Sequence, residues 1–181
     1  MKLSDLTVVT TSKNKLVEIN QILGTNHNVS KLDILEIQSL DLDEVIAEKA
    51  RAAYQKLKKP VLVEDISLEI KALKGLPGTF IKYFLKTLGT EGTVALVKGK
   101  KNDTEVTAAV AIYDGKNLKI FKGTVSGTLS PKDRGVHGFG FDKVFIPKGY
   151  AKTYAQMPPK LKNKISHRAK ALNQVKKYLS A

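Results

Sequence analysis

Strand-like and helix-like segments alternate along the first third of the chain. Residues 6–10 (LTVVT) form a short β-branched apolar run, whereas residues 15–23 (KLVEINQIL) repeat apolar side chains at helical spacing. A second strand is expected at 29–34, a helix over 43–57, and a third strand at 61–63, after the break made by KKP. Such alternation is typical of helices packed on a sheet that contains parallel strands.

The rest of the chain adds a hairpin and two further helical segments. Residues 105–113 and 118–129 are strand-like and flank a DGKN turn, residues 79–88 form a short amphipathic segment, and apolar side chains from 161 to 179 keep a helical period. We therefore expect an α/β fold with a mixed, twisted sheet flanked by helices. A length of 181 residues suits one core better than two, so we expect a single domain over residues 1–181.

The charge of the chain points to anionic partners without choosing among them. Lysine and arginine number 31 against 17 acidic residues, a net charge of +14. This surplus attracts nucleic acid, nucleotides or acidic membrane surfaces, but a lysine-rich solubilising surface explains it equally well. No apolar run is long enough for a signal peptide or a membrane span, and there is no cysteine. We expect a cytoplasmic protein without membrane contact.

The turn TTSKNK lies between the first strand and the first helix. Backbone N–H groups and the positive end of a helix dipole favour an anion at such a place, and hydroxyls and lysines strengthen the site for a polyphosphate. A helix N-cap formed by Ser12 or Asn14 explains the same letters without a ligand. The turn contains no glycine, which excludes a Walker A loop.

The run VLVEDISLE places Glu64 and Asp65 side by side, where we expect the third strand to end at Val63. Ligands of open α/β sheets gather beyond the carboxyl ends of strands, and Mg²⁺ is often held there by one or two carboxylates and by phosphate. Glu36, just after the second expected strand, is a candidate second ligand. The alternative is a solvated turn, or surface ion pairs with some of the many lysines.

Two later segments also admit two interpretations. In GFGFD, Phe139 or Phe141 would stack on a base and Asp142 would accept from its edge, although core filling is the commoner fate of phenylalanine. In KLKNKISHRAKAL, His167 and Arg168 point in different directions around a helix, so they would meet one ligand only near a helix end or in a crevice. Otherwise this segment is an exposed basic helix.

Taken in order, these segments resemble the inosine triphosphate pyrophosphatase family, which hydrolyses non-standard purine nucleoside triphosphates. The resemblance runs from about residue 6 to residue 172. It rests on TTSKNKLVE, the acidic segment LEIQ, VEDISL, ALKGLPG, FGFD, TYAQMP and KNKISHR, which occur in the order that the family pattern has. Each motif alone is weak, whereas the ordered set is specific.

The resemblance implies a role for each of these segments. Glu36 and Asp65 would hold Mg²⁺, and Asp65 would also orient or deprotonate the attacking water. The triphosphate would bind to Thr10, Thr11, Ser12, Lys13, Asn14, Lys15, Lys49 and Lys82. The base would bind to Phe139, Gly140, Phe141, Asp142, Lys162, His167 and Arg168.

The resemblance also implies an activity and an assembly. ITP, dITP and XTP would be hydrolysed to the nucleoside monophosphate and pyrophosphate, which removes them from the nucleotide pool. The enzyme would be a homodimer and would not require nucleic acid. A pyrophosphatase for modified pyrimidine triphosphates and a basic nucleic-acid-binding module are the two alternatives from the sequence.

Overall fold

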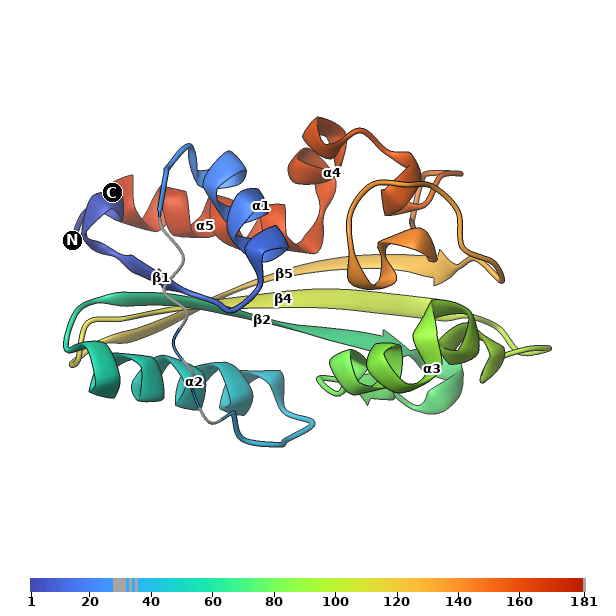
Figure 1. The fold of residues 1–181 in the computed structure, drawn as a ribbon, viewed down its shortest axis with the longest axis horizontal. Helices are drawn as coiled ribbons and strands as arrows, with labels where there is room; N and C mark the ends of the chain where they lie inside the picture. Colours follow the sequence, from blue (N-terminus) through green and yellow to red (C-terminus); the bar gives the residue numbers. More distant parts are fainter. Residues whose placement is uncertain (28–31, 33, 35, 181) are drawn as a thin grey trace. The chain divides into compact units, whose positions relative to one another are not determined.

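The computed structural model describes residues 1–27, 32, 34 and 36–180 (Figure 1). Its helices and strands follow one another in the order β1 (Thr7–Val9), α1 (Lys13–Leu23), α2 (Leu42–Leu57), β2 (Val61–Ile70), β3 (Pro77–Gly78), α3 (Ile81–Ala95), β4 (Asp103–Tyr113), β5 (Leu118–Leu129), β6 (Phe145–Pro147), α4 (Pro159–Ile165) and α5 (His167–Ser180). None of the helices in the described part of the chain is long and apolar enough to cross a bilayer.

The described strands form a mixed sheet in the order β1-β2-β4-β5-β6, with β3 paired to β2. Strand β1 runs parallel to β2, with Thr7 opposite Val61. Strand β3 pairs with the far end of β2 in the antiparallel sense, and β6 pairs with β5 in the same sense. The prediction of an α/β fold with a mixed sheet flanked by helices is therefore confirmed.

The chain divides into two compact units that interleave along the sequence. Unit 1 comprises Met1–Asp65, Ala108–Gly123 and His167–Ala181, and unit 2 comprises Ile66–Thr107 and Thr124–Ser166. Each unit contains a part of β2, β4 and β5. The expectation of one domain over residues 1–181 stays a prediction.

In unit 1, helices cover both faces of the strands. Helices α1 and α5 contact each other and lie on one face, and α2 lies on the opposite face (Figure 1). Asp41 caps α2 by accepting from the N–H of Asp43 at 2.8 Å. The apolar stripe of α2 then packs on the strands in a core of Val9, Ile46, Ala50, Ala53, Val61, Val63, Ala109 and Ala111.

In unit 2, the core collects side chains from most of its elements. It contains Leu68, Ile70, Ile81, Val94, Val97, Val106, Val125, Leu129, Phe141, Val144, Phe145, Tyr154 and Met157. Helix α3 matches the segment expected at 79–88 over its first half, and Gly89, at φ 70°, interrupts its helical geometry before Ala95.

Two expectations about element ends are wrong. Strand β2 does not end at Val63 but continues to Ile70, so Glu64 and Asp65 lie inside it. The helical period from 161 to 179 is broken at Ser166, whose φ of −69° and ψ of 161° are extended, so that α5 begins at His167. Most of the strand expected at 29–34 lies outside the described residues.

Glycine is required where β5 meets α5 in unit 1. A Cβ atom on Gly123 would lie 2.3 Å from the carbonyl oxygen of His167 and 2.5 Å from the backbone nitrogen of Ala171. Both atoms belong to the helix backbone, which cannot rotate away as a side chain could. Because Gly123 has no side chain, the first turn of α5 can lie this close to β5.

We predict that Gly123→Ala lowers the free energy of unfolding by about 1–3 kcal/mol, because the added methyl group must push the backbone of α5 away. Urea denaturation measures this difference. Lys119→Ala, at an exposed position of the same strand, should change it by less than about 0.5 kcal/mol. Equal stability of the two variants would contradict the close approach.

Candidate active site

The turn before α1 is held by two side-chain hydroxyls. Ser12 is the N-cap of the helix, and its Oγ accepts from the N–H of Lys15 at 3.2 Å. Thr10 Oγ1 accepts from the N–H of Ser12 at 3.1 Å. The capping interpretation of this turn is confirmed for Ser12. The cap also places Lys15 in the first turn of the helix, where the helix dipole favours an anion.

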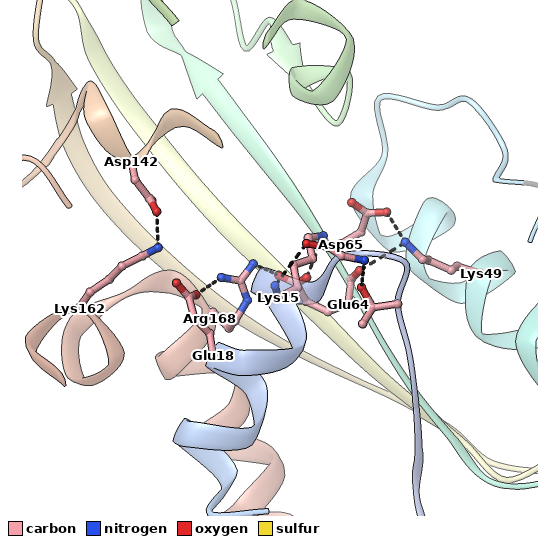
Figure 2. A network of polar contacts seen from close by, with 10 residues as sticks. Lys15, Glu18, Lys49, Glu64, Asp65, Asp142, Lys162 and Arg168 are labelled. Carbon is pink, nitrogen blue, oxygen red and sulfur yellow. Dashed lines mark hydrogen bonds and ion pairs between the residues drawn. The ribbon is translucent and has the colours of Figure 1, made fainter. Parts of the chain in front are cut away.

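Glu64 and Asp65 contact different helices because they are neighbours in a continuous strand. Successive side chains of a strand point to opposite faces. Glu64 contacts Lys15 of α1 and Arg168 of α5, whereas Asp65 contacts Lys49 of α2 (Figure 2). The alternative of a solvated turn is wrong, because both acids lie within β2 and are paired with cations.

The first cluster is a buried network around Glu64. The Nζ atom of Lys15 lies 2.8 Å from Glu64 Oε2, and Arg168 Nη2 lies 2.9 Å from Glu64 Oε1. The other terminal nitrogen of Arg168 binds Glu18, and the side chains of Glu64 and Arg168 are each only 1% exposed. Burial by itself would raise the pKa of Glu64, but the charges of Arg168 and Lys15 outweigh it and lower this pKa to about 2. Glu64 is therefore ionised in the folded chain.

The second cluster joins Glu36 and Asp65 through one ammonium group. Lys49 Nζ lies 2.7 Å from Glu36 Oε1 and 3.0 Å from Asp65 Oδ2. Burial acts to lower the pKa of Lys49, but the two carboxylates raise it above its usual range. Burial acts to raise the pKa of Asp65, but Lys15 and Lys49 hold it below its usual range. Asp65 is thus a carboxylate at neutral pH.

The two clusters together carry one net negative charge in a chain whose net charge is +14. The cations are Lys15, Lys49 and Arg168, and the acids are Glu18, Glu36, Glu64 and Asp65. Such an excess of acid weakens the attraction of a polyphosphate to these clusters unless another cation joins it. The local charge therefore favours a cation that arrives with the ligand or before it.

The second cluster has the donor set that Mg²⁺ takes. Mg²⁺ is usually bound by one or two carboxylates together with waters and substrate phosphates, rather than by an all-protein cage. Glu36 and Asp65 supply two carboxylates that already converge on one positive charge. Among the described residues, no three acidic or imidazole side chains gather into a fuller metal site. Glu36 and Asp65 therefore fit the predicted metal.

A separate polar cluster lies within unit 2, around Asp142. This carboxylate pairs with the ammonium of Lys162 and accepts from the N–H of Phe139 at 2.7 Å. The same ammonium lies 4.9 Å from the centroid of the Phe139 ring, at cation–π distance. Phe141 is buried and meets Phe145 edge to face at 6.2 Å, so core filling is confirmed for Phe141. Phe139 remains half-buried and Gly140 exposed.

The remaining predicted residues lie in different settings. Lys82 is the exposed second residue of α3, and Thr11, Lys13 and Asn14 are exposed in or beside the first turn of α1. The break at Ser166 makes His167 and Arg168 the first two residues of α5, and both are buried. The alternative of an exposed basic helix is therefore wrong for these two residues.

Sequence reasoning missed the part that Glu18 plays. Glu18 closes the motif TTSKNKLVE and lies one helical turn after Lys15, on the buried face that also carries Leu16, Ile19 and Ile22. An acid on the apolar side of a helix signals a buried cationic partner, because desolvating an unpaired carboxylate is costly. Arg168, which supplies the partner, is 150 positions away in the sequence.

Comparisons with known proteins agree over nearly the whole chain. A family model described as the Ham1 family matches residues 6–178. The chain is 39% identical to a protein of Hyperthermus butylicus named dITP/XTP pyrophosphatase, covering 95% of this chain and 93% of that protein. It is 43% identical to a protein of Yarrowia lipolytica named inosine triphosphate pyrophosphatase, covering 95% and 94%. A solved HAM1 protein structure from Coxiella burnetii superposes with a TM-score of 0.80 at 26% identity, covering 97% and 98%.

We predict that Arg168→Met lowers the free energy of unfolding by about 3–5 kcal/mol, because it leaves Glu18 and Glu64 buried without their shared cation. Arg51→Met is the matched control, since Arg51 pairs with Glu48 on the surface with both side chains about half exposed. That change should cost less than about 1 kcal/mol. Urea denaturation of both variants makes the comparison, and a loss as small as that of the control would show that the buried network is not needed.

Proposed function

Because the chain belongs to the Ham1 family, we propose that it hydrolyses non-standard purine nucleoside triphosphates. The proposed substrates are ITP, dITP and XTP, and the products are the nucleoside monophosphate and pyrophosphate. The relatives named as dITP/XTP and inosine triphosphate pyrophosphatases support this choice of substrates. The structural observation that carries the proposal is the convergence of Glu36 and Asp65 on one positive charge.

The triphosphate is placed at the turn before α1. The first backbone N–H groups of a helix and its dipole form an anion site, which Thr10, Thr11, Ser12, Lys13 and Asn14 border. Lys15 adds a positive charge whose direction is fixed by its ion pair with Glu64. Lys49 and Lys82 are proposed as further contacts with the phosphates, where their charges offset the charge on the phosphate oxygens.

Asp65 is proposed as the base that orients or deprotonates the attacking water. Lys15 and Lys49 hold the pKa of its carboxylate below the usual range against the effect of burial, so Asp65 is already ionised before a metal binds. Mg²⁺ held by Glu36 and Asp65 would supply positive charge to the phosphate oxygens. Water attacks a phosphorus atom, the bond to the bridging oxygen breaks, and pyrophosphate leaves with the electron pair of that bond.

We propose that the purine base is recognised by hydrogen-bond donors that match its 6-oxo group. In unit 2, Phe139 offers a half-buried ring for stacking, and Lys162 lies above that ring while Asp142 holds it. In unit 1, His167 and Arg168 are the further donors that the family resemblance implies, and Glu18 and Glu64 fix the direction of the guanidinium. Adenine carries an amino group at position 6, which leaves such donors unpaired and disfavours ATP.

The proposed assembly rests on the family resemblance, and the proposed location is the expectation from the sequence. We propose a homodimer that acts in the cytoplasm and needs no nucleic acid. A basic nucleic-acid-binding module, favoured by the charge of +14, remains the alternative from another class. It predicts salt-sensitive binding of DNA or RNA without hydrolysis of any triphosphate.

A substrate panel tests the function directly. ITP, dITP, XTP, dTTP, a modified pyrimidine triphosphate and ATP are each incubated with the protein, with Mg²⁺ and with EDTA, and pyrophosphate is measured. We expect pyrophosphate from the first three only, only with Mg²⁺, and with kcat/KM at least about a hundredfold above that for ATP. Preferential hydrolysis of the pyrimidine nucleotides would overturn the substrate class, and hydrolysis of none would favour the nucleic-acid alternative.

We predict that Asp65→Asn reduces kcat for ITP by about 10²–10⁴-fold, because the amide has the same shape but cannot accept the proton of water. Steady-state kinetics with pyrophosphate detection measures the loss. Asp43→Asn is the control, since Asp43 belongs to an exposed ion pair with Lys122 elsewhere in unit 1. Near wild-type turnover in the Asp65 variant, with a normal unfolding transition, would remove Asp65 from the mechanism.

A further inference from the structure

Lys49 is bound between Glu36 and Asp65 much as a ligand cation would be bound. Its ammonium group contacts Glu36 Oε1 at 2.7 Å and Asp65 Oδ2 at 3.0 Å, and it also donates to the backbone oxygen of Glu64 at 3.4 Å. An ammonium group has three N–H donors. Here each of them has an oxygen to bond, so the group is fully coordinated by protein atoms.

Solvent reaches this ion pair, unlike the pair between Arg168 and Glu64. The side chains of Lys49, Asp65 and Glu36 are 11%, 19% and 36% exposed, whereas those of Arg168 and Glu64 are each 1% exposed. An ion from solution can therefore approach Glu36 and Asp65. The buried pair serves stability, and the accessible pair is the one that can exchange its partner.

A divalent cation held by the same two carboxylates would meet the ammonium at close range. Both cations need the same oxygen lone pairs, and like charges in contact repel each other strongly in a partly buried place. We propose that Lys49 is a built-in competitor of the divalent cation for Glu36 and Asp65, and that entry of the metal releases its ammonium group toward the phosphates. This inference rests on the proposed function, because that function supplies the metal and the phosphates.

In the metal-free chain, Lys49 neutralises part of the charge of the two carboxylates. Two carboxylates without a cation between them would repel each other, and Lys49 holds Glu36 and Asp65 around one positive charge. Exchange of partners also changes the sign of the local charge. The group of Lys49, Glu36 and Asp65 carries one net negative charge, and one divalent cation makes it positive. Entry of the metal therefore adds to the attraction of a triphosphate at this place.

Binding of Mn²⁺ without nucleotide tests the competition. The signal of free Mn²⁺ in electron paramagnetic resonance gives the dissociation constant for the wild-type chain and for Lys49→Met, which keeps the length of the side chain but not its charge. We expect Lys49→Met to bind Mn²⁺ about tenfold more tightly. Lys122→Met is the matched control, because it removes the same charge from an ion pair with Asp43 at 2.7 Å in the same unit, and we expect its constant to change less than about twofold.

Lys49→Arg provides a second variant that keeps the positive charge. A guanidinium can bond both carboxylates at once, so Mn²⁺ should bind this variant no more tightly than the wild type. Thermal unfolding with and without Mn²⁺ shows that each variant is folded, and the rise in Tm caused by the metal should be largest in Lys49→Met.

The proposal is overturned if Lys49→Met binds Mn²⁺ no more tightly than the wild type, or if Lys49→Arg binds it more tightly than the wild type. It is also overturned if Lys122→Met gains as much affinity for Mn²⁺ as Lys49→Met does, or if no variant binds Mn²⁺. The same wild-type preparation is assayed for hydrolysis of ITP. Hydrolysis without the predicted order of affinities rejects the competition but keeps the proposed function. The predicted order of affinities without hydrolysis keeps the competition and rejects the function.

Discussion

Arg168 holds two buried carboxylates that come from two other elements, Glu18 of α1 and Glu64 of β2. These contacts join the start of α5 to the first helix and to a central strand, all within unit 1. The arrangement is stable only when complete, because each of these groups alone would be a desolvated charge. Once Glu64 is held in this way, its other oxygen is free to fix Lys15 at 2.8 Å. The direction of the proposed phosphate-binding lysine thus depends on an arginine that is distant in the sequence.

The chain has a net charge of +14, whereas the ion pairs at its proposed active site together carry one net negative charge. The surplus of lysine therefore does not act through this cluster directly. Substrate attraction depends there on a further cation, for which Glu36 and Asp65 are suited. This contrast separates two effects of charge. The surface surplus raises the concentration of anions near the protein, whereas the local excess of acid makes productive binding depend on the metal.

The strands and helices that the sequence predicts best are those with unbroken patterns, such as the hairpin of β4 and β5 and the stripe of α2. The expected end of the third strand was wrong for a definite reason. Two adjacent acids look like a solvated turn, because an unpaired carboxylate inside a sheet is too costly. Cations from three helices compensate that cost at Glu64 and Asp65. One of these cations, Arg168, lies at the start of α5. That helix begins there because the backbone is extended at Ser166, and the apolar period of the sequence does not reveal this break.

The sequence by itself determined the α/β class and, through its ordered motifs, the family, and it gave Ser12 as one of two candidate caps of the first helix. These are local patterns, or sets of local patterns, and they need no knowledge of distant contacts. Only the tertiary structure decided which cation each acid meets, that Glu18 belongs to the network, and that Lys49 lies between Glu36 and Asp65. Ion pairs between residues far apart in the chain depend on distances of a few ångströms, and such distances are set by how the helices pack on the sheet.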